Sequence, residues 1–185
     1  MTRNRTLSYF SVLIDRVAVL KAIHLKEIED GNVIFYMQYF SQANPINEYV
    51  EVKESPVEGM GVFAKKFIPK GTKWWHATKN DVLLLSRAQW EVLNQSYHTK
   101  LIDEFIQSII TYSYYSANLD CLILDLDNSR HVNHSDNPNC GGSDESPLES
   151  IALRDIYPNE EIFEDYHEME CPWTNLYPGV ERKNE

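Results

Sequence analysis

The segment Arg130–Cys140 holds the densest group of side chains that could do chemistry. It reads RHVNHSDNPNC and places histidine, asparagine, serine and aspartate around Pro138. Proline and three asparagines disfavour a helix, so we expect an irregular loop, a kind of segment that often carries functional polar groups. The same composition is also typical of a structural network of Asx turns, and both interpretations stay open.

Metal binding is a second interpretation of this loop. His131, His134 and Asp136, with His167 and Glu168 downstream, offer the nitrogen and oxygen ligands that zinc or iron accepts. Such a set would support a metal-dependent hydrolase. The spacing of the first two histidines suits one helical turn, which the neighbouring proline and asparagines disfavour, so we assign no metal.

Two weaker motifs flank this loop. Gly59 and Gly61 mark a tight turn where a ligand or another backbone segment approaches closely. They lack the third glycine and the following helix of a dinucleotide-binding fingerprint. The segment Glu160–Tyr166 reads as a strand that ends on a tyrosine, and by itself such a tyrosine is usually part-buried with a satisfied hydroxyl.

Short β-prone segments separated by proline and glycine predict the elements that carry these motifs. The expected strands are Tyr49–Lys53, Gly61–Lys66, Thr72–His76, Cys121–Leu126, Ser150–Arg154 and Glu161–Glu164. Between them, Ser86–Gln89 fits a capping box, and apolar residues from Leu101 to Ile110 recur at helical spacing. The pattern predicts an α+β fold dominated by sheet. The segment Lys65–Gly71 is similar in pattern to Arg154–Glu160, since each is a predicted strand that runs into a turn with a proline.

Composition narrows the class of partner. The 185 residues carry a formal net charge of −11, which argues against binding to a nucleic-acid backbone and favours a basic partner. The three cysteines are too widely spaced for a disulfide framework or a cysteine zinc cluster, so we expect a reducing intracellular compartment. They are Cys121, Cys140 and Cys171. We expect no secretory signal and no membrane span, and the acidic residues near the N-terminus disfavour a mitochondrial presequence.

In this order and spacing, the three segments Gly59–Ala64, Arg130–Asn139 and Pro158–Tyr166 resemble the signatures of the SET-domain protein lysine methyltransferases. The resemblance covers roughly residues 50–168. It implies an α+β, mostly β fold of small curved sheets, with a pseudoknot and a short helical insert. We therefore expect an N-terminal extension of unknown role (1–48), a SET domain (49–168) and a C-terminal tail that could close the cofactor pocket (169–185).

The resemblance also implies an activity and its residues. It implies that S-adenosylmethionine donates a methyl group, by in-line transfer, to a deprotonated lysine of a protein substrate. By correspondence, the backbone of Gly59, Met60 and Gly61 embraces the methionine part of the donor. Asn133 and the backbone of His134 hold its amino-acid and adenine parts, and Tyr166 is the catalytic tyrosine. Positioning and weak C–H···O contacts are then the main tasks of the protein.

The substrate lysine has to enter the site without its charge. An apolar aromatic channel beside a cationic donor disfavours the ammonium form. Tyr112, Tyr114 and Tyr115 are the candidate lining residues, with ordinary packing in a strand as the alternative.

Two departures from the family pattern affect the prediction. Asp136 stands where many members have a zinc-binding cysteine, and only Cys171 follows, so we expect no zinc site of that kind. Trp173 or Tyr177 is then the candidate cover for the adenine, with C-terminal packing as the alternative.

Glu164 is the second departure, because it stands where the family usually has Phe or Tyr, two residues before the catalytic tyrosine. It could limit the methylation state, change the substrate or point to solvent.

The leading prediction is therefore a methyltransferase that acts on a lysine-containing protein, with histone tails as one candidate. The alternative is a catalytically inactive SET-like interaction module. We expect no nucleic-acid or membrane partner and a nuclear or cytoplasmic location. The oligomeric state and the target lysine are not predicted.

Overall fold

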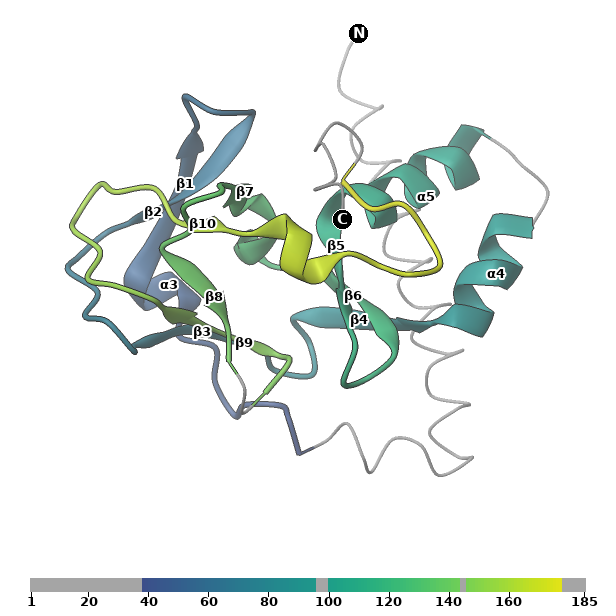
Figure 1. The fold of residues 1–185 in the computed structure, drawn as a ribbon, viewed down its shortest axis with the longest axis horizontal. Helices are drawn as coiled ribbons and strands as arrows, with labels where there is room; N and C mark the ends of the chain where they lie inside the picture. The colour runs from purple at the N-terminus through teal and green to yellow at the C-terminus, as the bar shows by residue number, and fades with distance from the viewer. Residues whose placement is uncertain (1–37, 96–99, 144–145, 178–185) are drawn as a thin grey trace, which may run out of the picture. The chain divides into compact units, whose positions relative to one another are not determined.

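The computed structural model describes residues 38–95, 100–143 and 146–177 (Figure 1). All of these except Gln38 belong to one compact unit that begins at Tyr39. Most of the predicted N-terminal extension lies outside the described residues, and so does the end of the predicted tail.

Small sheets dominate the described part of the chain. The elements in chain order are α3 (Ile46–Tyr49), β1 (Val50–Glu54), β2 (Met60–Ala64), β3 (Lys73–His76), β4 (Val82–Ser86), α4 (Arg87–Gln95), α5 (Lys100–Tyr112), β5 (Ser113–Ser116), β6 (Cys121–Asp125), η1 (Asn128–His131), β7 (Asn133–His134), β8 (Cys140–Gly142), β9 (Glu149–Ala152), β10 (Phe163–Glu164) and η2 (Tyr166–Met169). The strands pair as β1-β2, β7-β10, β3-β9-β8 and β4-β6-β5, and only the β7-β10 pair among them is parallel. The predicted α+β, mostly β class is confirmed.

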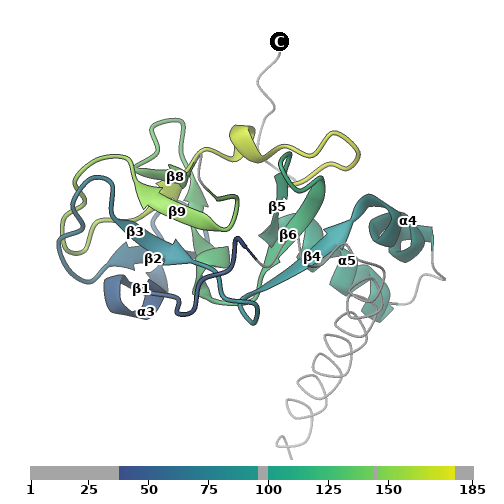
Figure 2. The ribbon, with the colours of Figure 1, turned by 90° about the horizontal axis from the view of Figure 1, so that it is seen from below.

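Burial explains the central sheet. Strand β6 is the middle strand of β4-β6-β5, and all five of its residues are buried. Strand β4, which we did not predict, is an apolar run that pairs along its whole length with β6. Helices α4 and α5 contact this sheet (Figure 2).

The helical insert forms as predicted. Ser86 and Gln89 bond reciprocally, because the Ser86 N–H donates to Gln89 Oε1 at 2.8 Å and the Gln89 N–H donates to Ser86 Oγ at 3.3 Å. This is the capping-box geometry, and α4 starts there. In α5, Ile109 is fully buried while Asp103 and Glu104 face solvent. No helix among the described residues is long and apolar enough to cross a membrane.

The two similar segments, Lys65–Gly71 and Arg154–Glu160, pair with each other through one residue of each. The N–H of Ile68 donates to the carbonyl of Ile156 at 2.9 Å, and the reverse bond has the same length. Both isoleucines are fully buried. Each segment then turns through a residue with positive φ, Gly71 at +80° and Asn159 at +68°. Glycine and asparagine are the residues that tolerate this conformation best.

Asn139 fixes the segment that leads into the last motif. Its side chain is almost wholly buried, with 1% of the residue exposed. Its Nδ2 donates to the carbonyl of Glu161 at 2.7 Å, and its Oδ1 accepts from the N–H of Phe163 at 2.8 Å. One amide thus satisfies two backbone groups on the approach to β10.

We expect Asn139→Leu to lower the free energy of unfolding by roughly 3 kcal/mol, because it leaves a buried carbonyl and a part-buried N–H without partners. Urea denaturation of the full chain measures this. The control is Asn137→Leu, at an exposed position of the same loop, for which a change within about 0.5 kcal/mol is expected. Equal stability of the two variants would contradict a role for the Asn139 bonds.

Candidate active site

The turn between β1 and β2 contains the first predicted cofactor residues. Gly59 has a φ of +48°, in the left-handed region, and its carbonyl accepts from the Ser55 N–H at 2.9 Å. Gly61 is required for a different reason. A Cβ there would clash with Glu161 Oε1 and lie 3.0 Å from the Ser55 Cβ. The turn therefore needs one glycine for its backbone conformation and a second for close approach.

The Asn133 side chain joins all three sequence motifs. Its Nδ2 lies 3.2 Å from the Glu58 carbonyl, 3.3 Å from the Met60 carbonyl and 2.9 Å from Glu161 Oε1. The other carboxylate oxygen of Glu161 accepts from Ser55 Oγ at 3.0 Å. Asn133 thus connects the glycine turn to the last motif, and the predicted residues Gly59, Met60, Gly61 and Asn133 lie together.

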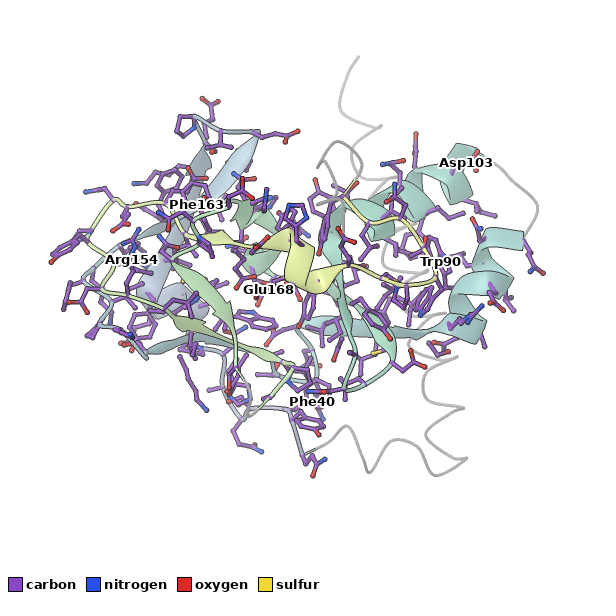
Figure 3. The ribbon with its side chains drawn as sticks, in the orientation of Figure 1. Phe40, Trp90, Asp103, Arg154, Phe163 and Glu168 are labelled. Carbon is purple, nitrogen blue, oxygen red and sulfur yellow. The ribbon has the colours of Figure 1, made fainter. Side chains whose placement is uncertain are left out.

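His134 is bonded to the segment that carries Tyr166. Strand β7 pairs in parallel with β10, with Asn133 opposite Phe163 and His134 opposite Glu164. His134 Nδ1 accepts from the backbone N–H of Tyr166 at 3.2 Å. Figure 3 labels Phe163 and Glu168, which lie on either side of this tyrosine on β10 and η2. The middle motif therefore holds the last motif through both backbone pairing and a side chain.

The Tyr166 hydroxyl points back to the middle motif. It donates a short hydrogen bond to the carbonyl of Val132, the residue before Asn133. The Tyr166 ring stacks on Tyr177, with ring centroids 4.1 Å apart. Burial, followed by the charge of Glu164, holds the pKa of the Tyr166 phenol well above its usual value. The phenol therefore stays protonated, so it is a hydrogen-bond donor and not a base.

A cavity of about 200 Å³ lies next to this segment, and Val132 is one of its lining residues. Three of the predicted channel residues, Tyr114, Tyr115 and Glu164, line it. The Tyr114 hydroxyl donates to the Pro147 carbonyl at 2.9 Å, which fixes that ring at the wall. Val132, whose carbonyl accepts from the Tyr166 hydroxyl, is one of the lining residues, whereas Tyr166 itself is not.

Carboxyl groups line the same cavity. The Glu164 carboxylate accepts a short bond from Ser150 Oγ, and burial raises its pKa. Asp125 is buried, Ser129 Oγ donates to its Oδ2 at 2.8 Å, and its pKa is raised well above the usual value, mainly by burial. Buried Glu149 pairs with Lys73 at 3.0 Å. Sequence reasoning singled out Glu164 and missed the other two, although an aspartate that ends the apolar run of β6 was a visible sign.

The remaining predicted residues lie around this centre. Tyr112 is 39% exposed and contacts His131 edge to face, with ring centroids 6.1 Å apart, and it is not part of the cavity wall. Trp173 lies edge to face against Tyr115, at 6.0 Å between centroids. Of the five residues considered as metal ligands, His134, Asp136 and His167 offer ligand atoms within 4.8 Å of one another, and His131 and Glu168 are not part of this group.

Comparison with known proteins gives a family match. The family model described as SET domain matches residues 59–167, which is more than half of the chain. No curated protein matches the sequence.

Two solved structures illustrate the structural similarity. A Plasmodium falciparum protein described as a histone methyltransferase aligns at 19% identity and a TM-score of 0.41, covering 68% of this chain and 97% of that one. A structure of ctPRC2 in an autoinhibited conformation, bound to S-adenosylmethionine, aligns at 19% identity and a TM-score of 0.47, covering 65% of this chain but 15% of that one. The fold, the convergence of the three motifs and the family match lead to one assignment: the chain belongs to the SET-domain family.

Proposed function

We propose that this chain is an S-adenosylmethionine-dependent protein-lysine N-methyltransferase. The observation that carries the proposal is the meeting of the three motifs at one point. Asn133 bonds the glycine turn and Glu161, while the carbonyl of its neighbour Val132 accepts the Tyr166 hydroxyl. A donor site and a catalytic tyrosine would then share one short segment.

S-adenosylmethionine is the methyl donor of SET-domain methyltransferases, and the residues here fit it. A Cβ at Gly59 would meet nothing within 4 Å, so that side of the turn is open. None of the described residues donates to Asn133 Oδ1, and the buried indole N–H of Trp173 also has no partner among them. Asn133 Oδ1 is thus available as an acceptor for an amino group. The donor would be held by Gly59, Met60, Gly61, Asn133, the backbone of His134, and Trp173.

When bound, S-adenosylmethionine supplies a methyl group that its sulfonium has already made electrophilic. The task of the chain is alignment. The phenol oxygen of Tyr166 and the carbonyl oxygen of Val132 can each accept a weak C–H···O contact, worth about 0.5–1 kcal/mol. In-line positioning of the amine contributes more, about 7–11 kcal/mol at best. Because Tyr166 stays protonated, it orients groups and takes no proton.

The cavity beside Val132 is the proposed channel for the substrate lysine. Its aromatic wall, with Tyr114 and Tyr115, disfavours a buried ammonium by desolvation. Carboxylates at the same wall act in the opposite direction, and the raised pKa values of Asp125 and Glu164 weaken that effect. Glu164 lies at this wall with a raised pKa. We assign it the role of a hydrogen-bonding partner that holds the incoming nitrogen and so limits the number of methyl groups added.

The substrate class follows from charge. A net charge of −11 favours a segment rich in lysine and arginine, and histone tails are the candidate of that kind. A nuclear or cytoplasmic location is part of this proposal, because such substrates occur there.

Tyr166→Phe tests the proposed catalytic residue. The variant keeps the ring but removes the hydroxyl and leaves the Val132 carbonyl without its donor. We expect the rate of radiolabelled methyl transfer to a histone mixture and to cell lysate to fall about tenfold or more. Isothermal titration should show that binding of S-adenosylmethionine is kept.

The matched control is Tyr157→Phe, since Tyr157 is 61% exposed and packs on Phe67 away from the site. Its labelling should equal that of the wild type. Equal labelling by Tyr166→Phe would mean that the tyrosine has been misassigned. Failure of the wild type to bind the donor would favour an inactive interaction module.

Glu164→Phe tests the proposed limit on methylation. The exchange removes the carboxyl group from the cavity wall and should raise the methylation state of the product, as read by mass spectrometry of a lysine peptide. Glu164→Gln keeps the size and a hydrogen-bonding group, so the product distribution should stay close to that of the wild type. An unchanged distribution for the phenylalanine variant would count against the role of Glu164.

A further inference from the structure

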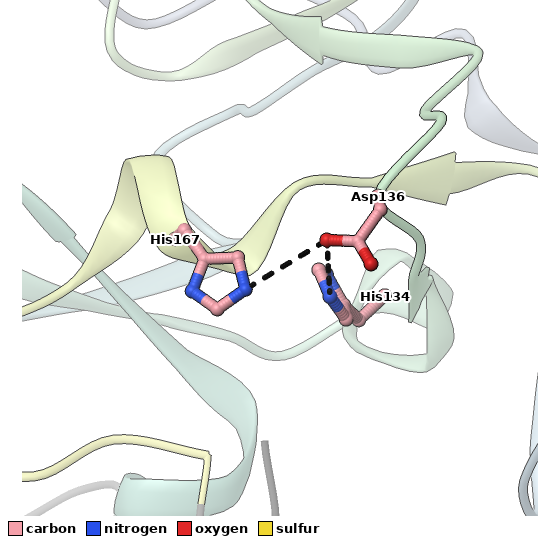
Figure 4. Close-up of side chains that lie close together, drawn as sticks. All are labelled: His134, Asp136 and His167. Atoms are coloured by element: carbon pink, nitrogen blue, oxygen red, sulfur yellow. Dashed lines mark ion pairs between the residues drawn. The ribbon is translucent and has the colours of Figure 1, made fainter. Parts of the chain in front are cut away.

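Three side chains on the surface next to Tyr166 converge on one point (Figure 4). His134 comes from β7, Asp136 from the loop that follows it, and His167 from η2. Asp136 Oδ1 lies 3.8 Å from His134 Nε2 and 4.0 Å from His167 Nε2. One ligand atom of each residue lies within 4.8 Å of the others. Both imidazoles thus present the same ring nitrogen to one carboxylate oxygen.

These separations suit a shared metal ion. Ligands that lie about 2.0 Å from a tetrahedral zinc ion are about 3.3 Å from one another. The observed 3.8 and 4.0 Å are slightly longer, so small rotations of the side chains would close the site. The Asp136 side chain is 79% exposed, whereas the His167 side chain is 12% exposed.

The groups behind the histidines also fit a metal site. His167 Nδ1 lies 3.4 Å from Glu170 Oε1, so the tautomer with its proton on Nδ1 can donate to this carboxylate and offers Nε2 to a metal ion. His134 Nδ1 lies 3.8 Å from Asp165 Oδ1. A carboxylate behind a ligating imidazole is the usual outer shell of a protein metal site, because it fixes the tautomer and raises the basicity of the ligand. Glu170 is within hydrogen-bond distance of His167, whereas Asp165 lies beyond that distance from His134.

We propose that His134 Nε2, Asp136 Oδ1 and His167 Nε2 bind a divalent transition-metal ion of the zinc type, with water completing the coordination. Two imidazoles and one carboxylate are ligands that Zn²⁺ accepts readily. Our expectation of no metal rested partly on the missing cysteines, and this ligand set needs none. The binding itself does not depend on the proposed methyl transfer.

The site is coupled to the tyrosine through His134. A neutral imidazole has one nitrogen with a lone pair and one that carries a proton. Without metal, His134 Nδ1 accepts from the Tyr166 N–H at 3.2 Å, so the proton is on Nε2. Metal binding at Nε2 moves this proton to Nδ1, where it can face Asp165, and no net proton is gained or lost. Metal binding and the Tyr166 backbone bond therefore compete.

Isothermal titration of the full chain with zinc chloride tests the binding. We expect one site per chain and at least a tenfold loss of affinity in His167→Ala and in Asp136→Asn. The latter is an exposed, nearly isosteric change that leaves folding intact. The chain has six histidines, so His131→Ala, outside the cluster, is the control and should bind like the wild type. No binding by the wild type, or equal binding by both cluster variants, would overturn the proposal.

The coupling between zinc binding and the Tyr166 backbone bond can be measured without an activity assay. In ¹⁵N-labelled wild type, zinc should shift the Tyr166 amide proton resonance, because that N–H loses its acceptor. The shift should be absent in His167→Ala at the same zinc concentration. A bound zinc ion with an unchanged Tyr166 resonance would overturn the coupling. These results are independent of methyl transfer, so they separate failure of this proposal from failure of the proposed function.

Discussion

The short parallel pairing of β7 with β10 is the interaction on which the site depends. It places Asn133 opposite Phe163 and His134 opposite Glu164, and so brings together two motifs that are far apart in the sequence. Two residues on each side are too few to hold by themselves. Side chains complete the junction, because Asn139 satisfies the backbone of Glu161 and Phe163, and His134 accepts from Tyr166. Hydrogen bonds from polar side chains thus hold these two strands together, as additional backbone hydrogen bonds do in a longer pair of strands.

Local sequence patterns predicted many of the elements. The capping box at Ser86 and the apolar face ending near Ile110 depend on neighbours three and four residues away, which a single sequence displays directly. The predicted strands also match observed ones to within two residues at most ends. Strand β4 was missed because a short apolar run carries no period that separates strand from helix.

Partners distant in the sequence could not be predicted in the same way. The echo between Lys65–Gly71 and Arg154–Glu160 was visible, but nothing local indicated that Ile68 bonds Ile156. The motifs near Gly59, Asn133 and Tyr166 were found by resemblance, while the acids Asp125 and Glu149 were not. Their importance arises from burial at a shared cavity, and burial depends on the tertiary fold.

The antiparallel bond pair between Ile68 and Ile156 has a consequence for biosynthesis. The first hairpin also needs the last motif, because the N–H of Ile162 donates to the Val62 carbonyl at 2.7 Å. Val62 and Ile68 are both fully buried in the finished protein. On the ribosome these hydrogen bonds therefore cannot form until the chain has been translated beyond Ile162 and that segment has left the exit tunnel. An incomplete chain thus lacks these contacts, and incompletely folded chains expose surface that makes them prone to aggregate.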